Sequence, residues 1–374
     1  MSRTDVLIIG GGIVGLVTAI ELAQAGARVL VVDAGCNAGT TANAGSLHVQ
    51  MQSRFMRLYP DQVPNIEASL PLYREAVREW VSLDAAFGPV ELVRKGGLML
   101  AEDETQLAFL EGKAAREAKK GVSTEILDRR ALERIAPWLG PQIIGAELCL
   151  DEGKVNPLVA NRRLRAVAEG LGVRFQPDHI RDLSVGDRID AVGTVGTYRA
   201  DSVVVAAAWG SGGLVQDLGV AIPSRAEPLH MNITEACSAR IEHLVQHAER
   251  SITLKQFQSG QIVIGGGWPA RDRGWNVVPA VEPASLLGNV SLAARLVPSI
   301  GHVRIIRTWA GMNTTIDGAS VIGPLPGCDR VVMAVPGDAG YTLGPLVAKL
   351  AAACVLGQGD QEVIERYGPA RFLS

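Results

Sequence analysis

The sequence has few cysteines, and their placement excludes the usual cysteine-based sites. Its 374 residues include five cysteines, which are widely spaced and form no C-x-x-C pair. Such a pattern predicts neither a disulfide framework nor a zinc or iron–sulfur centre. We therefore expect a reducing, cytoplasmic location and no metal site. The five residues are Cys36, Cys149, Cys237, Cys328 and Cys354.

Two further absences narrow the class of protein. The net charge is only −3, so no excess of basic residues indicates a nucleic-acid partner. A membrane span needs about 20 unbroken apolar residues. The apolar run from Val6 to Leu22 contains three consecutive glycines, and no signal-peptide cleavage site follows it. We predict that this run forms a buried strand and a helix instead.

That run lies in the most informative segment, "DVLIIGGGIVGLVTAIELAQAGARVLVVDAG". An apolar strand leads into Gly10-x-Gly12-x-x-Gly15, a helical pattern follows, and a second strand closes at Asp33. The first glycine permits the tight turn, the second lets the backbone approach a pyrophosphate, and the third lets helix and strand pack closely. The phosphates lie at the helix N-terminus, and the acidic residue accepts the ribose hydroxyls. The segment predicts a dinucleotide-binding unit, and Asp33 argues against a 2′-phosphate.

The motif alone leaves both NAD and FAD open. FAD enzymes of this type begin with the dinucleotide unit and return to it near the C-terminus. Here Gly337–Thr342 precede a helix expected from about Leu343 to Leu356. The N-terminus of that helix would stabilise negative charge on a reduced flavin by roughly 0.3–1 kcal/mol, whereas the alternative is an ordinary loop-to-helix transition. We therefore favour FAD.

The middle of the chain predicts a second domain. From about Pro228 the pattern changes to period two, so "LHMNITE", "ITLKQFQ" and "QIVIGGG" predict antiparallel strands, with a hairpin turn at Ser259-Gly260. The expected fold is α/β, with a Rossmann-like FAD-binding domain and a second, antiparallel-sheet substrate domain. The FAD-binding domain is expected to comprise 1–88, 142–226 and 302–374, and the substrate-binding domain 89–141 and 227–301.

Four segments carry a resemblance to a known family. They are "IIGGGIVGLVTAIELAQAGARVLVVDAG", "VVVAAAWGSGGLVQDLG", "PLHMNITE" and the stretch from "RTWAGMNTTIDGASVIGP" to "PGDAGYTLGP". With these, nearly the whole chain resembles the glycine oxidase and D-amino acid oxidase-like FAD amine oxidoreductases. Within that family, "NAGSLHVQ" is most similar to the B subunits of opine (octopine and nopaline) oxidases. The resemblance implies bound FAD, the two-domain fold of D-amino acid oxidase and glutathione reductase, and oxidation of a C–N bond beside a carboxylate.

The resemblance also implies where the cofactor lies. By this resemblance Thr40, Thr41, Asn43 and Ala44 lie along the flavin, the backbone amide of Ile180 meets the adenine, and Gly337–Thr342 cover the pyrimidine end. Together with the motif residues, the expected cofactor site comprises Gly10, Gly12, Ile13, Val14, Gly15, Asp33, Ala34, Thr40, Thr41, Asn43, Ala44, Gly45, Ser46, His48, Ile180, Ala207, Trp209, Gly337, Asp338, Gly340, Tyr341 and Thr342.

The sequence departs from the family pattern at two places. Glycine oxidases place a carboxylate-binding arginine after a "WAGL" stretch, but here Asn313 follows Met312 at that position. This puts a simple glycine or D-alanine oxidase in doubt. No cysteine occurs near Met312 or Gly337. We therefore predict non-covalent FAD, and an FMN at an interface with a partner subunit is a further option.

His48 and Tyr341 are the candidate catalytic residues, although a structural histidine is the alternative for His48. Extended residues two apart share a face, so Ser46, His48 and Gln50 are expected to alternate toward the cleft. Binding a carboxylate needs a cation, and each cation considered has a surface role as its alternative. The substrate-binding candidates are Arg54, Arg57, Lys255, Arg307 and Asn313.

Two further histidines, His243 and His247, are spaced as on one helix face. That spacing also suits a metal, but no third ligand is evident. We therefore predict a solvated helix face at this point.

The function that these features favour is FAD-dependent oxidation of a secondary amino acid, with cleavage of an opine to an L-amino acid and a 2-oxo acid. The alternatives are a dehydrogenase or oxidase for D-amino acids, D-hydroxyproline, glycine or sarcosine, a non-catalytic FAD subunit that relays electrons, and an NAD-dependent dehydrogenase. The related β subunits work beside an α subunit and often a small iron–sulfur subunit. We expect similar partners here.

Overall fold

A computed structural model describes residues 4–36 and 39–373, and its first sheet contains the dinucleotide segment. The main path of this sheet runs β17-β18-β11-β1-β2-β8, with β10 beside β11 and β9 beside β10. Strand β1 pairs in parallel with both β2 and β11, which makes it central. Because a central parallel strand is covered on both faces, it needs an unbroken apolar run. The strands are β1 Thr4–Ile9, β2 Val29–Asp33, β8 Arg174–Pro177, β9 Ile180–Val185, β10 Ile189–Gly193, β11 Thr197–Val205, β17 Val321–Leu325 and β18 Cys328–Val335.

Helix α1 (Ile13–Gln24) follows β1 directly and packs against α10 (Gly340–Val355), which also contacts α4 (Val63–Phe87). The expected strand and helix at the N-terminus are therefore confirmed. A Cβ at Gly15 would lie 1.8 Å from the carbonyl oxygen of Gly10. Only glycine permits this approach, which agrees with the close packing expected at that position.

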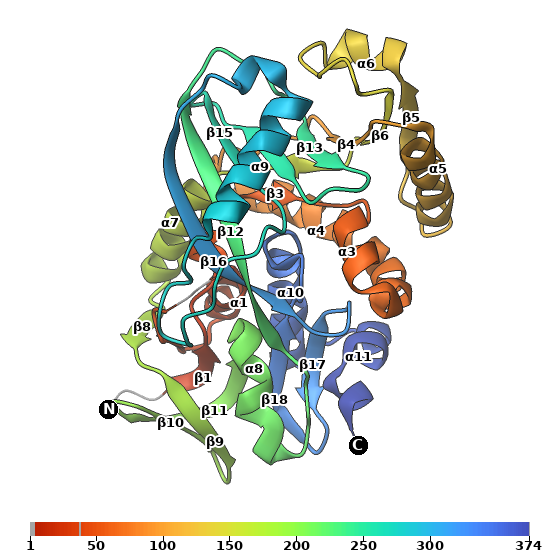
Figure 1. Cartoon of the computed structure of the whole chain (residues 1–374). Coiled ribbons are helices and arrows are strands. Elements are labelled where there is room, and N and C mark those ends of the chain that lie inside the picture. Colours follow the sequence, from red (N-terminus) through yellow and green to blue (C-terminus); the bar gives the residue numbers. More distant parts are fainter. Residues whose placement is uncertain (1–3, 37–38, 374) are drawn as a thin grey trace.

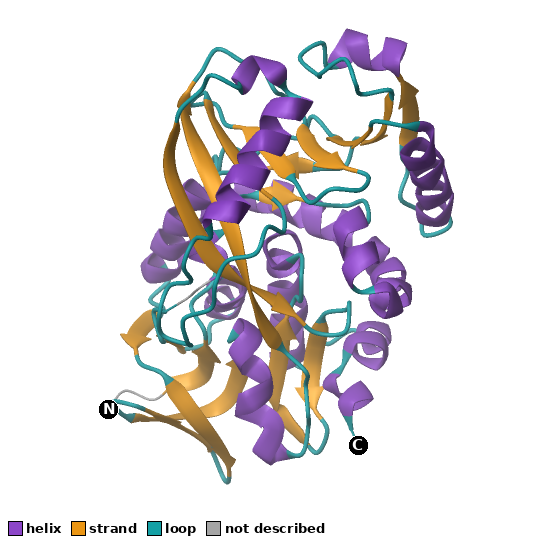
Figure 2. Cartoon of the chain, in the orientation of Figure 1, coloured by secondary structure: helices purple, strands orange, loops and turns teal. Residues whose placement is uncertain are grey.

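The second sheet is mostly antiparallel and has the order β16-β12-β15-β14-β13-β4-β6-β5, with β4 and β13 parallel. Its longest strands, β12 and β16, extend from this sheet toward the first one (Figure 1). Helix α9 (Pro283–Leu296) lies across one face (Figure 2), and α5 (Glu104–Ala118) and α6 (Arg129–Ile135) lie at the β5 end. The strands are β4 Gly97–Ala101, β5 Glu125–Asp128, β6 Gly145–Cys149, β12 Arg225–Ala236, β13 Leu244–His247, β14 Thr253–Gln256, β15 Gln261–Gly265 and β16 Ile305–Thr315.

This architecture confirms the predicted α/β class with a second, largely antiparallel sheet. The strands expected from period-two alternation are β12, β14 and β15. Gly260 has a φ of 82°, as the expected hairpin turn requires. Strands β6 and β16 pair within the second sheet, although both lie in segments assigned above to the FAD-binding domain. The boundaries of the two domains stay a prediction.

The interpretation of His243 and His247 was wrong. His247 ends strand β13, His243 directly precedes that strand, and both side chains are buried. A spacing of four residues does not place two side chains on one helix face when the backbone between them is extended. There is therefore no solvated helix face at this position.

The remaining elements complete the frame around the first sheet. Across the described ranges, no helix is both long and apolar enough to cross a bilayer. These elements are α2 Gly39–Ala42, β3 Ser46–Leu47, α3 Ser53–Leu58, β7 Gly153–Lys154, α7 Pro157–Gly170, α8 Ser211–Val215 and α11 Gln361–Tyr367.

Candidate functional site

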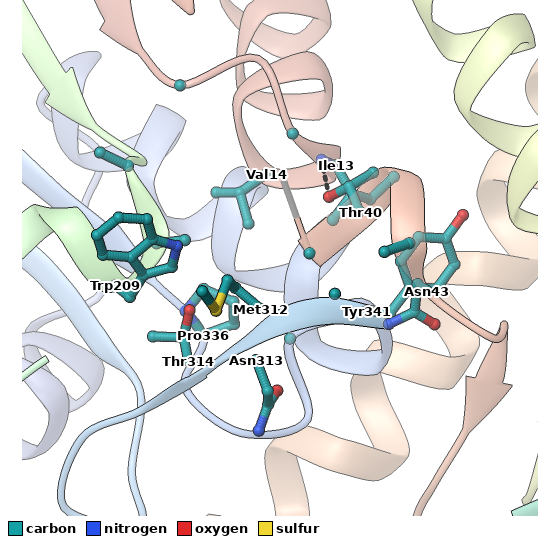
Figure 3. A pocket seen from close by; sticks show the side chains of 18 of the residues that line it. Ile13, Val14, Thr40, Asn43, Trp209, Met312, Asn313, Thr314, Pro336 and Tyr341 are labelled. Carbon is teal, nitrogen blue, oxygen red and sulfur yellow. Dashed lines mark hydrogen bonds between the residues drawn. The ribbon is translucent and has the colours of Figure 1, made fainter. Parts of the chain in front are cut away.

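A cavity of about 640 Å³ is lined by residues of both sheets. Nineteen of the 22 residues expected at the cofactor line it. The exceptions are Gly15, Thr41 and Gly45. Figure 3 shows Thr40 against the start of α1, with Tyr341 and Asn43 on one side of the pocket and Trp209 on the other. The sequence therefore located most of the wall of a single cavity.

The N-terminus of α1 opens into this cavity. Its first turn contains no acidic residue, and the backbone N–H of Ile13 donates to Oγ1 of Thr40 at 2.9 Å. Gly10 has a φ of 108°, and a Cβ there would lie 2.3 Å from the carbonyl oxygen of Ala206. A Cβ at Gly12 would meet only the end of the Thr40 side chain, at 2.9 Å. Packing against Ala206 therefore leaves no room for a side chain at Gly10, whereas Gly12 faces the space of the cavity.

Asp33 ends strand β2 beside this turn. One of its carboxylate oxygens accepts from the backbone N–H of Gly11, and the other accepts from the backbone N–H of Gly35 at 2.7 Å. Asp33 also lines the cavity. The carboxylate is therefore held by backbone groups at the position expected for a ribose contact.

The backbone of the loop "NAGSLHVQ" passes close to the backbone at Val155, and this approach requires a small residue at position 45. Gly45 has a φ of 78°, and a Cβ there would lie 2.0 Å from the carbonyl oxygen of Val155. Its N–H donates to Oδ1 of Asn43 at 2.7 Å, and the short strand β3 then pairs with β7. Gly45 thus serves the chain turn, while its neighbours Asn43, Ala44 and Ser46 line the cavity.

His48 is a buried residue in the cavity wall. Its backbone N–H donates to Oγ1 of Thr342 at 3.0 Å, and its Nδ1 lies 3.9 Å from Oε1 of Glu152. Burial, together with the positive charge of Lys255, lowers the pKa of His48 to about 3. The imidazole is therefore neutral at neutral pH.

Lys255 is buried next to the cavity rather than in its lining. Its ammonium group donates to Oγ of Ser46 at 2.6 Å. Burial, reinforced by Lys154, lowers the pKa of Lys255 to about 7. Lys255 thus reaches the cavity through the hydroxyl of Ser46.

The expectation that Gln50 points toward the cleft was wrong. Its side-chain amide donates to Oε2 of Glu152 at 2.9 Å, and its Oε1 accepts from Lys113 at 3.3 Å. The alternation holds for Ser46 and His48, both of which line the cavity, but Gln50 does not line it. The side chain of Gln50 lies in a buried polar layer instead.

Glu152 is the centre of that layer, and no pattern in the sequence pointed to it. It is fully buried and accepts from the backbone N–H groups of Val49 (2.8 Å) and Gln50 (3.1 Å). Its other oxygen accepts from the side-chain amides of Gln50 and Gln246, the latter at 3.0 Å. In the sequence Glu152 stands in the polar stretch "LDEGK", which is typical of an exposed turn.

A second buried group lies behind the same loop. Lys113 is 1% exposed and lies 2.8 Å from both Glu117 and Glu147, which are fully buried. Glu117 also accepts from the backbone N–H of Met51 at 2.6 Å. The backbone from Val49 to Met51 is therefore held by two buried carboxylates.

At another part of the cavity, four polar side chains form one cluster. Arg54 makes an ion pair with Glu227, and the amide of Asn313 donates to both Glu227 (3.2 Å) and Asp338. Arg54, Asn313 and Asp338 line the cavity. Burial raises the pKa of Asp338 to about 7. We call these four residues the Arg54 cluster.

Two of the expected substrate-binding cations lie elsewhere. Arg57 is exposed and donates to the carbonyl oxygen of Ala248 at 2.9 Å, and Arg307 is exposed on β16. Neither lines the cavity. The structure therefore places neither of these two side chains where a ligand in the cavity would meet it.

Tyr341 lines the cavity, but its hydroxyl is engaged. The hydroxyl donates to Oδ1 of Asn161 at 3.0 Å, and the ring stacks on Trp80 with centroids 5.1 Å apart. Burial raises the pKa of Tyr341 above its ordinary value. A role for the hydroxyl as an acid or base gains no support from this geometry.

Comparison with known proteins shows which proteins this chain resembles in sequence and in structure. The model of the DAO family, described as FAD dependent oxidoreductase, matches residues 5–354. Glycine oxidase of Bacillus licheniformis is 26% identical over 364 residues, which cover 95% of this chain and 94% of that protein. The B subunit of opine oxidase from Agrobacterium tumefaciens is 24% identical over 336 residues, which cover 86% and 85%. Among solved structures, L-proline dehydrogenase from P. horikoshii has a TM-score of 0.84 at 21% identity, covering 99% of this chain and 98% of that one.

Glu152 leads to a prediction about pH and stability. Burial raises its pKa from 4.5 to about 7. Between these values the unfolded chain loses this proton while the folded protein keeps it, so stability falls as pH rises. The loss amounts to at most about 3 kcal/mol and is complete above pH 7. Urea unfolding of Glu152→Gln between pH 4 and 8 should lack this component of the pH dependence.

The control for this measurement is Glu125→Gln, which changes an exposed glutamate on β5. It should follow the wild-type pH dependence. If Glu152→Gln and the wild type lost stability in parallel across this pH range, the buried carboxyl would not be the titrating group.

Proposed function

Because the chain belongs to the DAO family of FAD-dependent oxidoreductases, we propose that it oxidises the C–N bond of a secondary amino acid, and that an opine is its substrate. The observation that carries the proposal is that one cavity contains the α1 N-terminus, His48 and the Arg54 cluster. The cavity thus combines a phosphate-binding turn, the neutral imidazole of His48 and the guanidinium of Arg54. In the proposed function the imidazole contacts the amine of an N-substituted amino acid, and the guanidinium contacts its carboxylate.

The residues present fit FAD. The N-terminus of α1, which lines the cavity, suits a pyrophosphate, because its N–H groups and dipole favour negative charge. Gly12 has no side chain to fill that space, and Asp33 stands at the end of β2 for a ribose. We propose that Gly10, Gly12, Ile13 and Asp33 hold the dinucleotide. When bound, FAD accepts the two electrons of the C–N oxidation as a hydride.

The side chains around the reacting amine have distinct tasks in this proposal. An amine must lose its ammonium proton before its C–H bond is oxidised. His48 is neutral at neutral pH and lines the cavity, so its nitrogen lone pair accepts a hydrogen bond from the amine, while the ammonium proton leaves to solvent water because an imidazole with a pKa of about 3 does not hold it. The carboxylate of the substrate requires a cation. Water then hydrolyses the oxidised C–N bond, and an opine yields an L-amino acid and a 2-oxo acid.

The choice of an opine rests on two features. The loop "NAGSLHVQ" resembles the B subunits of opine oxidases, and one of the relatives is named as such a B subunit. In addition, position 313 is asparagine, so the site differs from that of simple glycine oxidases. The alternative is an amino acid oxidase or dehydrogenase with a smaller donor, because glycine oxidase and D-amino acid dehydrogenase are also among the relatives.

We also propose that the chain works with partner subunits. The support is that related proteins are named as the B subunit of opine oxidase and the beta subunit of sarcosine oxidase. An α subunit and a small iron–sulfur subunit would then receive the electrons, because no iron–sulfur pattern of cysteines occurs in this sequence. A cytoplasmic location remains part of the proposal.

The substrate proposal is tested by anaerobic mixing of the FAD-loaded protein with octopine, nopaline, glycine, sarcosine, D-alanine and D-hydroxyproline. An opine should bleach the flavin absorbance faster than any of the smaller amines. Subsequent air should reoxidise the protein slowly and an artificial acceptor quickly, if a partner is the natural acceptor. A smaller amine that outperforms every opine would overturn the opine assignment, and rapid peroxide formation by the chain alone would overturn the partner proposal.

The cofactor proposal is tested at Gly12. In Gly12→Ala the added methyl group meets only the Thr40 side chain within the protein, whose Oγ1 must shift slightly, but it occupies the expected pyrophosphate space. The variant should fold and bind FAD about ten- to a hundredfold more weakly, a cost of 1–3 kcal/mol. FAD binding is measured by fluorescence quenching on titration. The control Gly112→Ala, at an exposed position of helix α5 where an added Cβ has no atom within 4 Å, should bind FAD normally.

The role of His48 is tested by His48→Ala. Loss of one well-placed polar contact costs about 1–3 kcal/mol, so kcat/KM for the amine should fall about ten- to a hundredfold. The flavin spectrum should be unchanged. His302→Ala, at an exposed position, serves as the control. Wild-type kcat/KM in His48→Ala would mean that the loop only covers the cavity.

A further inference from the structure

We propose that Arg54 binds the carboxylate of the substrate, and that Glu227 holds the guanidinium in position for it. The inference rests on the proposed function, since it assigns the recognition of an amino acid to one residue. It also replaces the set of cations left open by the sequence with a single candidate.

The position of Arg54 sets it apart from the other cations. In the part of the chain that the structure describes, Arg54 and Arg181 are the lysines and arginines that line the cavity. Arg181 lies on β9, at the outer end of the first sheet. Arg54 lies in the same cluster as Asn313 and Asp338, and its side chain is 10% exposed.

The guanidinium of Arg54 retains donors for a ligand. A guanidinium has five N–H donors. One terminal nitrogen donates to Glu227, while the buried Nε has no hydrogen-bond partner among residues 4–36 and 39–373. Arginine binds carboxylates with two parallel hydrogen bonds. A buried N–H group without a partner is costly, so an incoming carboxylate would relieve it.

Glu227 supplies the positioning. It lies on β12 directly opposite Asn313 on β16 in the register of the two strands. It accepts from Arg54, from Asn313 and, at 3.4 Å, from the hydroxyl of Tyr59. Three donors, one on α3, one directly after α3 and one on β16, hold this carboxylate, and the carboxylate in turn holds Arg54.

The charges of the cluster permit an anion. Arg54 and Glu227 cancel, so the charge of Asp338 decides whether a carboxylate is repelled. Burial raises the pKa of Asp338 to about 7 because this effect exceeds the opposing influence of Arg54 and Asn313. At and below neutral pH a large share of the protein therefore carries a neutral Asp338, and the cluster accepts a negative ligand.

A glycine provides the space that Arg54 occupies. A Cβ at Gly267 would lie 2.0 Å from Nε and 2.1 Å from Cδ of Arg54. Gly267 also lines the cavity. Any side chain at position 267 would therefore displace the guanidinium without changing the charge of the cluster, which gives a second way to test the proposal.

The test measures binding rather than turnover. Anthranilate and its neutral analogue anthranilamide are titrated into the FAD-loaded protein by calorimetry at pH 6.5. The wild type should bind the carboxylate more tightly than the amide. In Arg54→Gln the Kd of anthranilate should rise about ten- to a hundredfold, while that of anthranilamide changes less than about twofold. Gly267→Ala should show the same selective loss, and Arg54→Lys an intermediate one.

The control is Arg78→Gln, at an exposed position of α4, which should leave both Kd values unchanged. The proposal is overturned if the wild type does not prefer the carboxylate to the amide, or if Arg54→Gln weakens both ligands equally. Because neither probe has an oxidisable C–N bond, failure of the opines as substrates would leave this result intact. Conversely, a wild type that does not prefer the carboxylate would overturn the role of Arg54, whereas bleaching of its flavin by an opine would still support the proposed oxidation.

Discussion

The fully buried carboxylate of Glu152 is the contact on which the arrangement of the cavity wall depends. It accepts from the backbone N–H groups of Val49 and Gln50, immediately after His48, and from Gln246 of the second sheet. A buried carboxylate is costly unless N–H groups surround it. The loop after His48 therefore has little freedom to leave its position against the second sheet. Since Thr342 of α10 accepts from the backbone N–H of His48, helix α10 and the second sheet together hold the backbone that carries the imidazole.

The features that the sequence predicted well are local or periodic. The turn at Gly10 to Gly15 depends on residues within one short segment. In the strands of the second sheet, apolar and polar residues alternate with a period of two. By contrast, the partners of Glu152 in the loop are 102 and 103 residues away, and Glu227 is 173 residues from Arg54. No spacing rule connects residues so far apart. The same reason explains the errors at Gln50 and His247, where only the tertiary structure shows that a polar side chain is buried.

The polar groups around Ser46 and His48 show how burial shapes the chemistry available to the site. Burial lowers the pKa of both His48 and Lys255, so two nitrogen bases near the cavity are largely or partly neutral at neutral pH. In water the lysine would carry a proton at that pH. Ser46 links Lys255 to the cavity, and Thr342 links His48 to the carbonyl oxygen of Ser46. On this side the cavity thus presents a neutral imidazole to an ammonium substrate, and the lysine behind Ser46 is only partly protonated at neutral pH.

The pairing of β12 with β16 explains how substrate recognition can change while the fold does not. Glu227 and Asn313 are opposite each other in this pair, so a cation at position 313 would compete with Arg54 for the same carboxylate. With asparagine there, the strong ionic interaction of Glu227 is with Arg54 on the short helix α3. In the proposed site, the guanidinium therefore approaches the cavity from a helix next to the His48 loop instead of from a strand of the sheet. If the proposal holds, exchange of one side chain on β16 changes the direction from which a carboxylate is held, because residue 313 reaches Glu227 through its side chain and pairs with β12 through its backbone.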